Sequence, residues 1–474
     1  MSIDNAGVLK LVERTWQDDI VPALTRYIAI PSLSPMFDAS WREHGHIDDA
    51  VTLISEWCRA RPVEGMTYEV VQLQDRTPMI VIEVAPFAGG DPDDTVVLYG
   101  HLDKQPEMTG WRDGLGPWTP VREGDRLYGR GGADDGYAVF ASLTAIEACQ
   151  RAGGRHARLV VLIEASEESG SPDLPAYVEH LASRIGTPSL VVCLDSGCLT
   201  YDRMWLTTSL RGLVSATLSV QVLLEGAHSG EAGGVVPSSF RLVRQILDRL
   251  EDSRTGELLL PELYAQIPEG RVAEARATAS ELPSIIADSY RFAGGTQPMK
   301  SEPSEALLAR TWQPALAVTG ADGLPPTSKA GNVLRPSTSL HMSLRIPPTV
   351  DDRAARDAIV RTLTADPPEG AVVSVDNVES ASGWNAPATA PWLTAATEAA
   401  SLACYGNGAR WFGEGGSIPF MGMLGSRFPQ AQFAVTGALG PGANAHGPNE
   451  YLHVPMATRL TGCIALLLDA HARR

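Results

Sequence analysis

Short apolar runs alternate with a helical pattern through the first part of the chain. Residues 79–84, 95–99, 159–163 and 190–194 are strand-length runs rich in β-branched side chains. Between the second and third runs, Val139, Leu143 and Ile146 recur at helical spacing within residues 137–151. Alternation of strands and helices is typical of an α/β sheet with helices on its faces. We therefore expect an α/β domain here.

The pattern changes after residue 210. Residues 214–222 alternate apolar and polar side chains, and residues 339–345 do the same, as expected of strands that bury only one face. Helices are predicted over 239–252 and 351–365. This middle region is predicted to be a separate α+β domain with an antiparallel sheet. Residues 255–330 are rich in Pro and Gly and give no assignable pattern.

The α/β character returns after residue 380. Helices are predicted over 392–404 and 457–471, and a strand over 432–435. The simplest organisation is one α/β domain, residues 1–210 and 381–474, interrupted by an inserted domain, residues 211–380. A chain of 474 residues exceeds the usual size of a single hydrophobic core, which agrees with more than one domain.

Composition and charge argue against several partners and locations. The net charge of −18 argues against nucleic acid and anionic membranes as partners. No apolar run approaches the roughly 18 residues that span a bilayer, and residues 1–10 show no signal peptide. Buried free thiols are the better interpretation of the cysteines, so a cytoplasmic protein is expected. The cysteines are scattered through the chain: Cys58, Cys149, Cys193, Cys198, Cys404 and Cys463.

Acidic and histidine side chains follow the strand-like runs. In open α/β sheets, ligands bind at the carboxyl ends of the strands, so side chains that follow different strands are expected to share one site. A glycine-rich turn and a distant Gly/Pro loop contribute further members. The set comprises His101, Asp103, Asp134, Glu167, Glu168, Asp195 and His446.

Two imidazoles and three carboxylates without a thiolate suit zinc, manganese or cobalt. Five protein ligands are too many for one open catalytic zinc, but they suit two ions that share a bridging carboxylate. Glu167 is then free to act as the base for a metal-bridging water. Asp103 is placed to accept the second imidazole N–H of His101. The candidate ligands are His101, Asp134, Glu168, Asp195 and His446.

Each residue alone has a simpler interpretation. Adjacent carboxylates such as Glu167-Glu168 are usually solvated. Asp134-Asp135 could cap the helix that follows, and Asp195 could cap the next element. A histidine at the end of a strand is more often structural than a ligand. Only the combination of these segments indicates a metal site.

The motifs resemble those of the dinuclear-metal peptidases and amidohydrolases. This family includes carnosinase-type dipeptidases, carboxypeptidase G-type enzymes, acetylornithine deacetylase and succinyl-diaminopimelate desuccinylase. The resemblance spans nearly the whole chain. It implies an α/β catalytic domain, with a mixed sheet, helices on both faces and a dinuclear metal site, interrupted by an inserted α+β lid and dimerisation domain. It rests on Gly100-His101-Leu102-Asp103, Arg130-Gly131-x-x-Asp134-Asp135, Glu167-Glu168-Ser169-Gly170-Ser171, Asp195-Ser196 and the late His446.

The resemblance also implies roles for these residues. Glu167 would be the general base and proton shuttle, and a cis peptide is expected between Asp134 and Asp135. Two divalent ions, with zinc expected first, would be held by His101 with Asp195 and by Glu168 with His446, with Asp134 bridging them.

The predicted inserted domain carries further matches. His228, in Gly226-Ala227-His228-Ser229-Gly230, resembles the family's lid histidine, which in dimeric members reaches the partner's site and stabilises the oxyanion. Asn332 and Arg345 match lid residues that hold the substrate carbonyl and carboxylate. Without the resemblance, Arg345 would be interpreted as a solvated charge on a sheet face.

A loop in the last part of the chain matches one that contacts the substrate. Gly416 and Ser417, in Gly415-Gly416-Ser417-Ile418-Pro419, are therefore predicted substrate contacts. Family dipeptidases usually carry Arg directly before the Glu that precedes this loop. This chain has Gly413 before Glu414, with Arg410 three residues earlier, so its substrate is expected to depart from a standard dipeptide.

The expected function is a metallohydrolase that cleaves an amide bond next to a free carboxylate, with a carnosinase-like dipeptidase as first choice. The alternative is an N-acyl-amino-acid deacylase, a desuccinylase or a carboxypeptidase that uses the same metal site. A non-catalytic binding protein of the same fold is the remote alternative. The expected substrate is a small molecule, a dipeptide or an N-acyl amino acid, and the expected assembly is a homodimer through the inserted domain.

Overall fold

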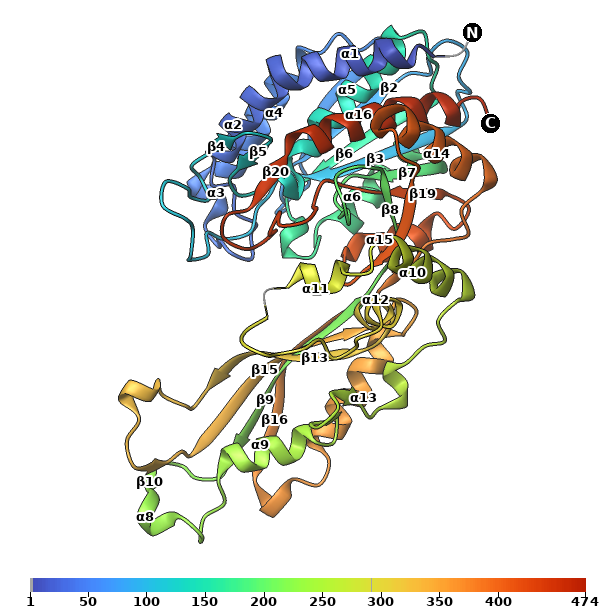
Figure 1. The fold of residues 1–474 in the computed structure, drawn as a ribbon. Helices are drawn as coiled ribbons and strands as arrows, with labels where there is room; N and C mark the ends of the chain where they lie inside the picture. Colours follow the sequence, from blue (N-terminus) through green and yellow to red (C-terminus); the bar gives the residue numbers. More distant parts are fainter. Residues whose placement is uncertain (1–2, 291) are drawn as a thin grey trace.

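A six-stranded sheet forms the centre of the α/β part in the computed structural model, which describes residues 3–290 and 292–474 (Figure 1). β3 pairs in parallel with β6 and β7, and β7 pairs in parallel with β19, whereas β1 and β2 are antiparallel to their neighbours. The carboxyl ends of β3, β6 and β7 therefore meet at one edge. In spatial order the strands are β1 (Met66–Val71), β2 (Met79–Val84), β6 (Arg158–Glu164), β3 (Thr95–His101), β7 (Pro188–Cys193) and β19 (Gln432–Val435).

Helices cover both faces of this sheet, which explains why its strands are nearly continuous apolar runs. Every residue of β3 is buried. Leu98 belongs to the hydrophobic cluster of one face and Tyr99 to that of the other. One face carries α1 (Asn5–Thr15), α5 (Tyr137–Arg151), α14 (Pro391–Tyr405) and α16 (Val454–His471), and the other carries α6 (Leu174–His180) and α15 (Pro419–Arg427). The prediction of a mixed α/β sheet with helices on both faces is confirmed.

Smaller elements border the edge at which the parallel strands end. α2 (Val21–Ile28) and α4 (His46–Arg59) pack in the first hydrophobic cluster. A three-stranded sheet joins β4 (Val121–Glu123) and β5 (Arg126–Tyr128) to β20 (Tyr451–His453). Residues near position 450 are thus brought beside residues near position 128.

A second, elongated part extends from the α/β part (Figure 1). Its antiparallel sheet has the order β13 (Ala315–Asp322), β15 (Ser337–Ile346), β9 (Gly212–Gln221) and β16 (Val372–Ala381). Burial alternates along β9 and β15, because one face packs against α9 (Ser239–Leu247) and α13 (Asp352–Thr364). The predicted inserted α+β sheet with one buried face is confirmed.

The described residues of the segment that gave no assignable pattern include three α-helices: α10 (Glu269–Glu281), α11 (Ile285–Ser289) and α12 (Pro303–Trp312). α10 and α12 pack against β18 (Arg410–Glu414). β18 belongs to a small sheet with β8 (Trp205–Leu210) and β17 (Trp384–Asn385). β8 leads into β9 at Arg211, and β16 leads back to β17. The division at residues 210/211 and 380/381 stays a prediction.

The helix predicted over 239–252 is too long. α9 ends at Leu247, and β11 (Glu251–Asp252) forms a short hairpin with β12 (Glu257–Leu258). After Leu247 a single turn replaces the helix, with the N–H of Leu250 donating to the carbonyl of Leu247 at 2.8 Å. The hairpin turn is then held by Asp252 Oδ1, which accepts the backbone N–H of Arg254, and by Gly256 at φ +73°. Among the described residues, no helix is long and apolar enough to cross a membrane.

Candidate metal centre and substrate cavity

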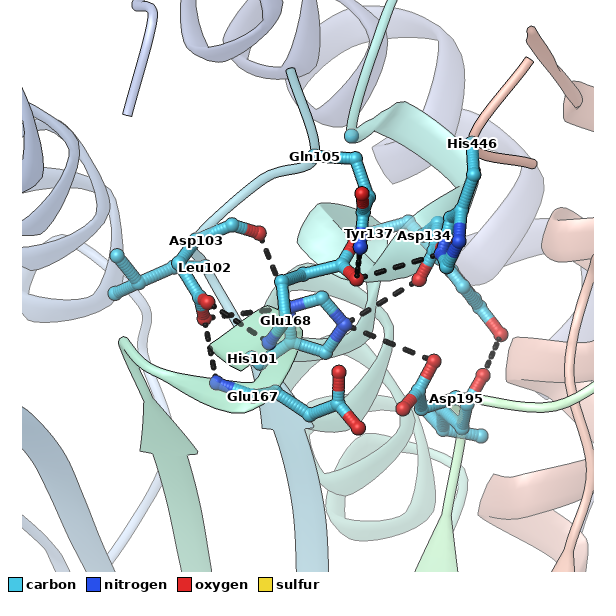
Figure 2. A network of polar contacts seen from close by, with 12 residues as sticks. His101, Leu102, Asp103, Gln105, Asp134, Tyr137, Glu167, Glu168, Asp195 and His446 are labelled. Carbon is cyan, nitrogen blue, oxygen red and sulfur yellow. Dashed lines mark hydrogen bonds and ion pairs between the residues drawn. The ribbon is translucent and has the colours of Figure 1, made fainter. Parts of the chain in front are cut away.

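Side chains from three adjacent parallel strands converge at the carboxyl edge of the central sheet. His101 is the last residue of β3, Glu167 and Glu168 lie in the turn after β6, and Asp195 follows β7. Figure 2 shows these side chains pointing toward one another, together with Asp134 and His446 from two loops. The structure thus brings together all five predicted ligands and the predicted base.

Asp134 stands between the two histidines. His101 Nε2 lies 3.3 Å from Asp134 Oδ1, and His446 Nε2 lies 2.9 Å from Asp134 Oδ2. Asp195 Oδ1 is 3.7 Å from the first imidazole, and Glu168 Oε2 is 3.3 Å from the second. Each half of the cluster therefore has one histidine and one carboxylate, with a shared carboxylate between the halves.

The turn before α5 places the shared carboxylate. The peptide between Asp134 and Asp135 is cis, and the N-cap residue of α5 is Gly136. Asp134 contacts both histidines, so it does not act as the helix cap that the sequence left open. A Cβ at Gly100 would lie 2.7 Å from Asp135 Oδ2, so the end of β3 needs glycine to approach this turn closely.

Asp103 acts differently from the sequence-based expectation. The backbone carbonyl of Asp103 lies 3.1 Å from His101 Nδ1, whereas the carboxylate is 3.6 Å away. That carboxylate instead accepts the backbone N–H of Glu167 at 3.1 Å and of Glu168 at 3.0 Å. The imidazole is oriented by a main-chain oxygen, and the side chain fixes the turn that carries both glutamates.

A buried ion pair supports the loop that carries His446, whose side chain is about half exposed at 54%. Arg130 and Glu450 pair directly, with both side chains buried. Glu450 also accepts the backbone N–H of Gly131 at 2.8 Å, and Arg130 donates to the carbonyl of Gly447 at 3.0 Å. Sequence reasoning missed Glu450, because a glutamate after a Pro-Asn turn has no signal that separates it from a solvated one.

The cluster carries more negative charge than the protein neutralises. Burial, reinforced by Asp195, raises the pKa of Glu167 well above its usual value. Burial and Asp134 do the same to the pKa of Glu168, and burial raises the pKa of Asp195 to about 6. His101 Nε2 is buried and has no hydrogen-bond partner among the described residues. Divalent cations would supply the missing positive charge and the missing partner, so the residues fit a metal centre.

The cluster opens into a cavity of about 900 Å³. Arg345, Gly416 and Ser417 line the same cavity as Asp134 and Glu167. Arg345 Nη1 donates to Ser417 Oγ at 2.9 Å, and Ser417 donates to the carbonyl of Arg211 at 2.6 Å. Arg345 is half-buried rather than solvated on a sheet face. Three of the predicted substrate contacts therefore face the metal cluster.

His228 and Asn332 lie elsewhere. β10 (Ala227–His228) pairs with β14 (Val333–Leu334), and the backbone N–H of Ser229 donates to the carbonyl of Asn332 at 2.9 Å. This pair of short strands forms the far end of the elongated part (Figure 1). Neither His228 nor Asn332 lines the cavity of its own chain.

Sequence reasoning also missed cavity residues in the unassigned segment. Asp288, Ser289, Tyr290 and Arg310 form one wall, on and beside α11 and α12. No periodic pattern or motif in the sequence predicts that these residues line a cavity. They line the cavity beside the candidate metal centre because α12 packs against β18 and α11 packs against α12.

The chain belongs to the peptidase family M20/M25/M40, whose model matches residues 97–470. The suspected family is therefore confirmed, and with it a metallohydrolase of the peptidase class. Within this class, the chain is 29% identical over 379 residues to the cysteinylglycine-S-conjugate dipeptidase of Corynebacterium striatum, a match that covers 77% of this chain and 79% of that protein. It is 26% identical over 367 residues to the mouse Beta-Ala-His dipeptidase, covering 74% and 71% of the two chains.

Two solved structures share the fold. The dipeptidase Dug1p from Saccharomyces cerevisiae superposes with a TM-score of 0.81 at 22% identity and full coverage of both chains. Human carnosine dipeptidase 1 superposes with a TM-score of 0.80 at 20% identity, covering 99% of each chain. The whole architecture, including the elongated part, is therefore shared with these two solved structures.

Proposed function

We propose that the protein is a metal-dependent dipeptidase that cleaves the amide bond next to a free C-terminal carboxylate. One observation carries this proposal: a buried cluster of metal-ligand side chains shares a single cavity with Arg345, a guanidinium with no carboxylate partner among the described residues. Arg binds a carboxylate bidentately, which would fix the substrate's free end. Two relatives, named as a cysteinylglycine-S-conjugate dipeptidase and a Beta-Ala-His dipeptidase, favour dipeptides over other amides.

Two divalent ions would be held in this centre, with zinc expected first and manganese or cobalt as alternatives. When bound, the ions would polarise the scissile carbonyl and lower the pKa of a water molecule, so that it can lose a proton and attack this carbonyl. The metal-holding residues would be His101 with Asp195, and His446 with Glu168, with Asp134 shared between the two ions.

Glu167 would move the proton. Its carboxylate lies within the cluster, and its ligand atom is within 4.8 Å of those of His101 and Asp195. It would take a proton from the attacking water and return it to the nitrogen of the leaving amine. Asp103 holds the backbone of this residue and so keeps the carboxylate aimed at the reacting atoms.

Replacement of the base tests this function. Glu167→Gln keeps the size of the side chain but removes the proton acceptor, so kcat should fall by about 10²–10⁴. Metal content, measured by elemental analysis, should remain at two ions per chain. Glu179→Gln, at an exposed position on α6, is the matched control. Undiminished turnover by the Glu167 variant would refute the assigned role.

The rival activity on the same centre is removal of an acyl group from an N-acyl amino acid. A panel of dipeptides and N-acyl amino acids with the same C-terminal residue separates the two activities. A non-catalytic binding protein would turn over neither class, whichever metal is loaded.

A homodimer would complete the site. His228 and Asn332 lie at the far end of the elongated part, so in one chain they do not reach the cavity. In a dimer formed through this part, His228 of one protomer would stabilise the oxyanion in its partner, and Asn332 would hold the substrate carbonyl. We also propose a cytoplasmic location, which is supported by six free cysteines.

A further inference from the structure

Three arginines line the substrate side of the cavity: Arg211, Arg310 and Arg345. All three are half-buried. In the described part of the chain, none of them has a carboxylate oxygen within 4.0 Å. Guanidinium groups that are half-buried without an anion are costly, so each needs a specific explanation.

Two of the three arginines make hydrogen bonds that indicate their roles. Arg211 donates through Nε to the carbonyl of Gly415 at 3.0 Å and through Nη1 to the carbonyl of Gln313 at 3.3 Å, so it holds the loop in place. Arg345 donates to Ser417 and faces the expected α-carboxylate. Arg310 makes no comparable contact with a described residue, and among these residues its buried Nε has no hydrogen-bond partner.

The packing of α12 on β18 brings Arg310 into the cavity. A Cβ at Gly413 would lie 2.6 Å from Ser209 Oγ and 3.1 Å from Thr311 Cβ, so a long side chain cannot enter from that position. A Cβ at Gly415 would lie 3.2 Å from Arg310 Cγ. Gly413 and Gly415, at the end of β18, therefore leave room for α12. The positive charge on this side of the cavity is supplied by Arg310, from α12.

The acidic groups on this side do not satisfy Arg310. Glu414 Oε2 accepts from Ser196 Oγ at 2.7 Å, and burial raises the pKa of Glu414 against the opposing effect of Arg310. Asp288, on the same wall, is exposed and accepts from Ser284 Oγ at 2.5 Å. Arg310 thus lines the cavity without an ion pair to any described carboxylate.

We propose that Arg310 binds a second negatively charged group of the substrate, so that the preferred C-terminal residue has an acidic side chain. This inference rests on the proposed function, in which Arg345 and Ser417 take the α-carboxylate. The side-chain carboxylate would then lie against Arg310, where it forms charge-assisted hydrogen bonds. A neutral amide of the same shape leaves the guanidinium unpaired and is disfavoured.

The test uses isosteric substrate pairs with the metal-loaded full-length enzyme. Ala-Glu is compared with Ala-Gln, and Ala-Asp with Ala-Asn, for the wild type and for Arg310→Met, Arg310→Lys and Arg276→Met. Arg276 is an exposed arginine on the neighbouring α10 that does not line the cavity, and it provides the matched control. Inhibition by free glutamate and by free glutamine gives a second readout that does not require hydrolysis of an acidic dipeptide.

The wild type should favour the acidic member of each pair at least tenfold in kcat/KM. Arg310→Met should lower this ratio about tenfold, mainly through KM, and Arg310→Lys should restore part of it. Inhibition by glutamate should weaken in parallel, whereas Arg276→Met should behave as the wild type. Equal kcat/KM for both members of a pair in the wild type, or an equal loss on both in Arg310→Met, would overturn the inference. Failure to hydrolyse any dipeptide or N-acyl amino acid would instead refute the proposed function.

Discussion

Glu450→Gln should destabilise the protein and empty one half of the metal centre. The amide retains an acceptor for the N–H of Gly131 but leaves the Arg130 guanidinium buried without its counter-charge. Removal of one partner from a buried ion pair costs about 3–5 kcal/mol. Because burial raises the pKa of Glu450 to about 7 against the opposing effect of Arg130, the pair is most fully ionised above neutral pH.

The assay is urea unfolding at pH 8, combined with metal analysis of the purified variant. The free energy of unfolding should fall by about 3–5 kcal/mol. The bound metal should fall from two ions toward one, because the loop of His446 loses its anchor while the half at His101 and Asp195 does not. Glu123→Gln breaks the exposed pair with Arg112 and should leave the free energy of unfolding almost unchanged. Unchanged stability with two retained metals would refute the role assigned to the Arg130–Glu450 pair.

The remaining predictions concern protons and assembly. The pKa of Asp195 is raised to about 6 in the metal-free protein, so metal binding should release protons. The apparent affinity for the metal should therefore rise with pH between about 5 and 7. Calorimetry in buffers of different ionisation enthalpy measures the proton release. Burial, with Arg474 nearby, lowers the pKa of His471 to about 4. The unfolded chain then binds more protons between about pH 4 and 6.5, so stability should fall as pH drops through this window, by up to about 3 kcal/mol, and less in His471→Gln. Light scattering should give a dimer, and mixing His228→Ala with Glu167→Gln protomers should restore activity in the heterodimers; an active monomer would contradict the role in trans.

Strand periodicity predicted much of the fold. β9 alternates because only one of its faces packs against helices, and β3 does not alternate because both of its faces do. The limits of the α9 prediction show where periodicity fails. After Leu247 the apolar spacing no longer decides the structure, because the chain turns into the hairpin of β11 and β12, whose turn is held by Asp252.

The residues that converge at the candidate metal centre could also be predicted, because the ability to bind a metal is a matter of side-chain chemistry and each member follows a strand or a tight turn. The sequence placed Asp103 beside His101 but could not tell a main-chain contact from a side-chain contact. That distinction depends on how the turn after β6 lies against the end of β3. The roles in catalysis stay predictions.

The sequence by itself determined the two kinds of sheet, the family and the residues that can hold a metal, since these follow from local periodicity and from the chemistry of individual side chains. Only the tertiary structure decided which residues complete the site. Glu450 and Arg310 have no distinctive sequence context, and each gains its place from packing between segments distant in the chain. Burial makes an unpaired charged side chain costly in free energy, and burial is a property of the fold rather than of the local sequence.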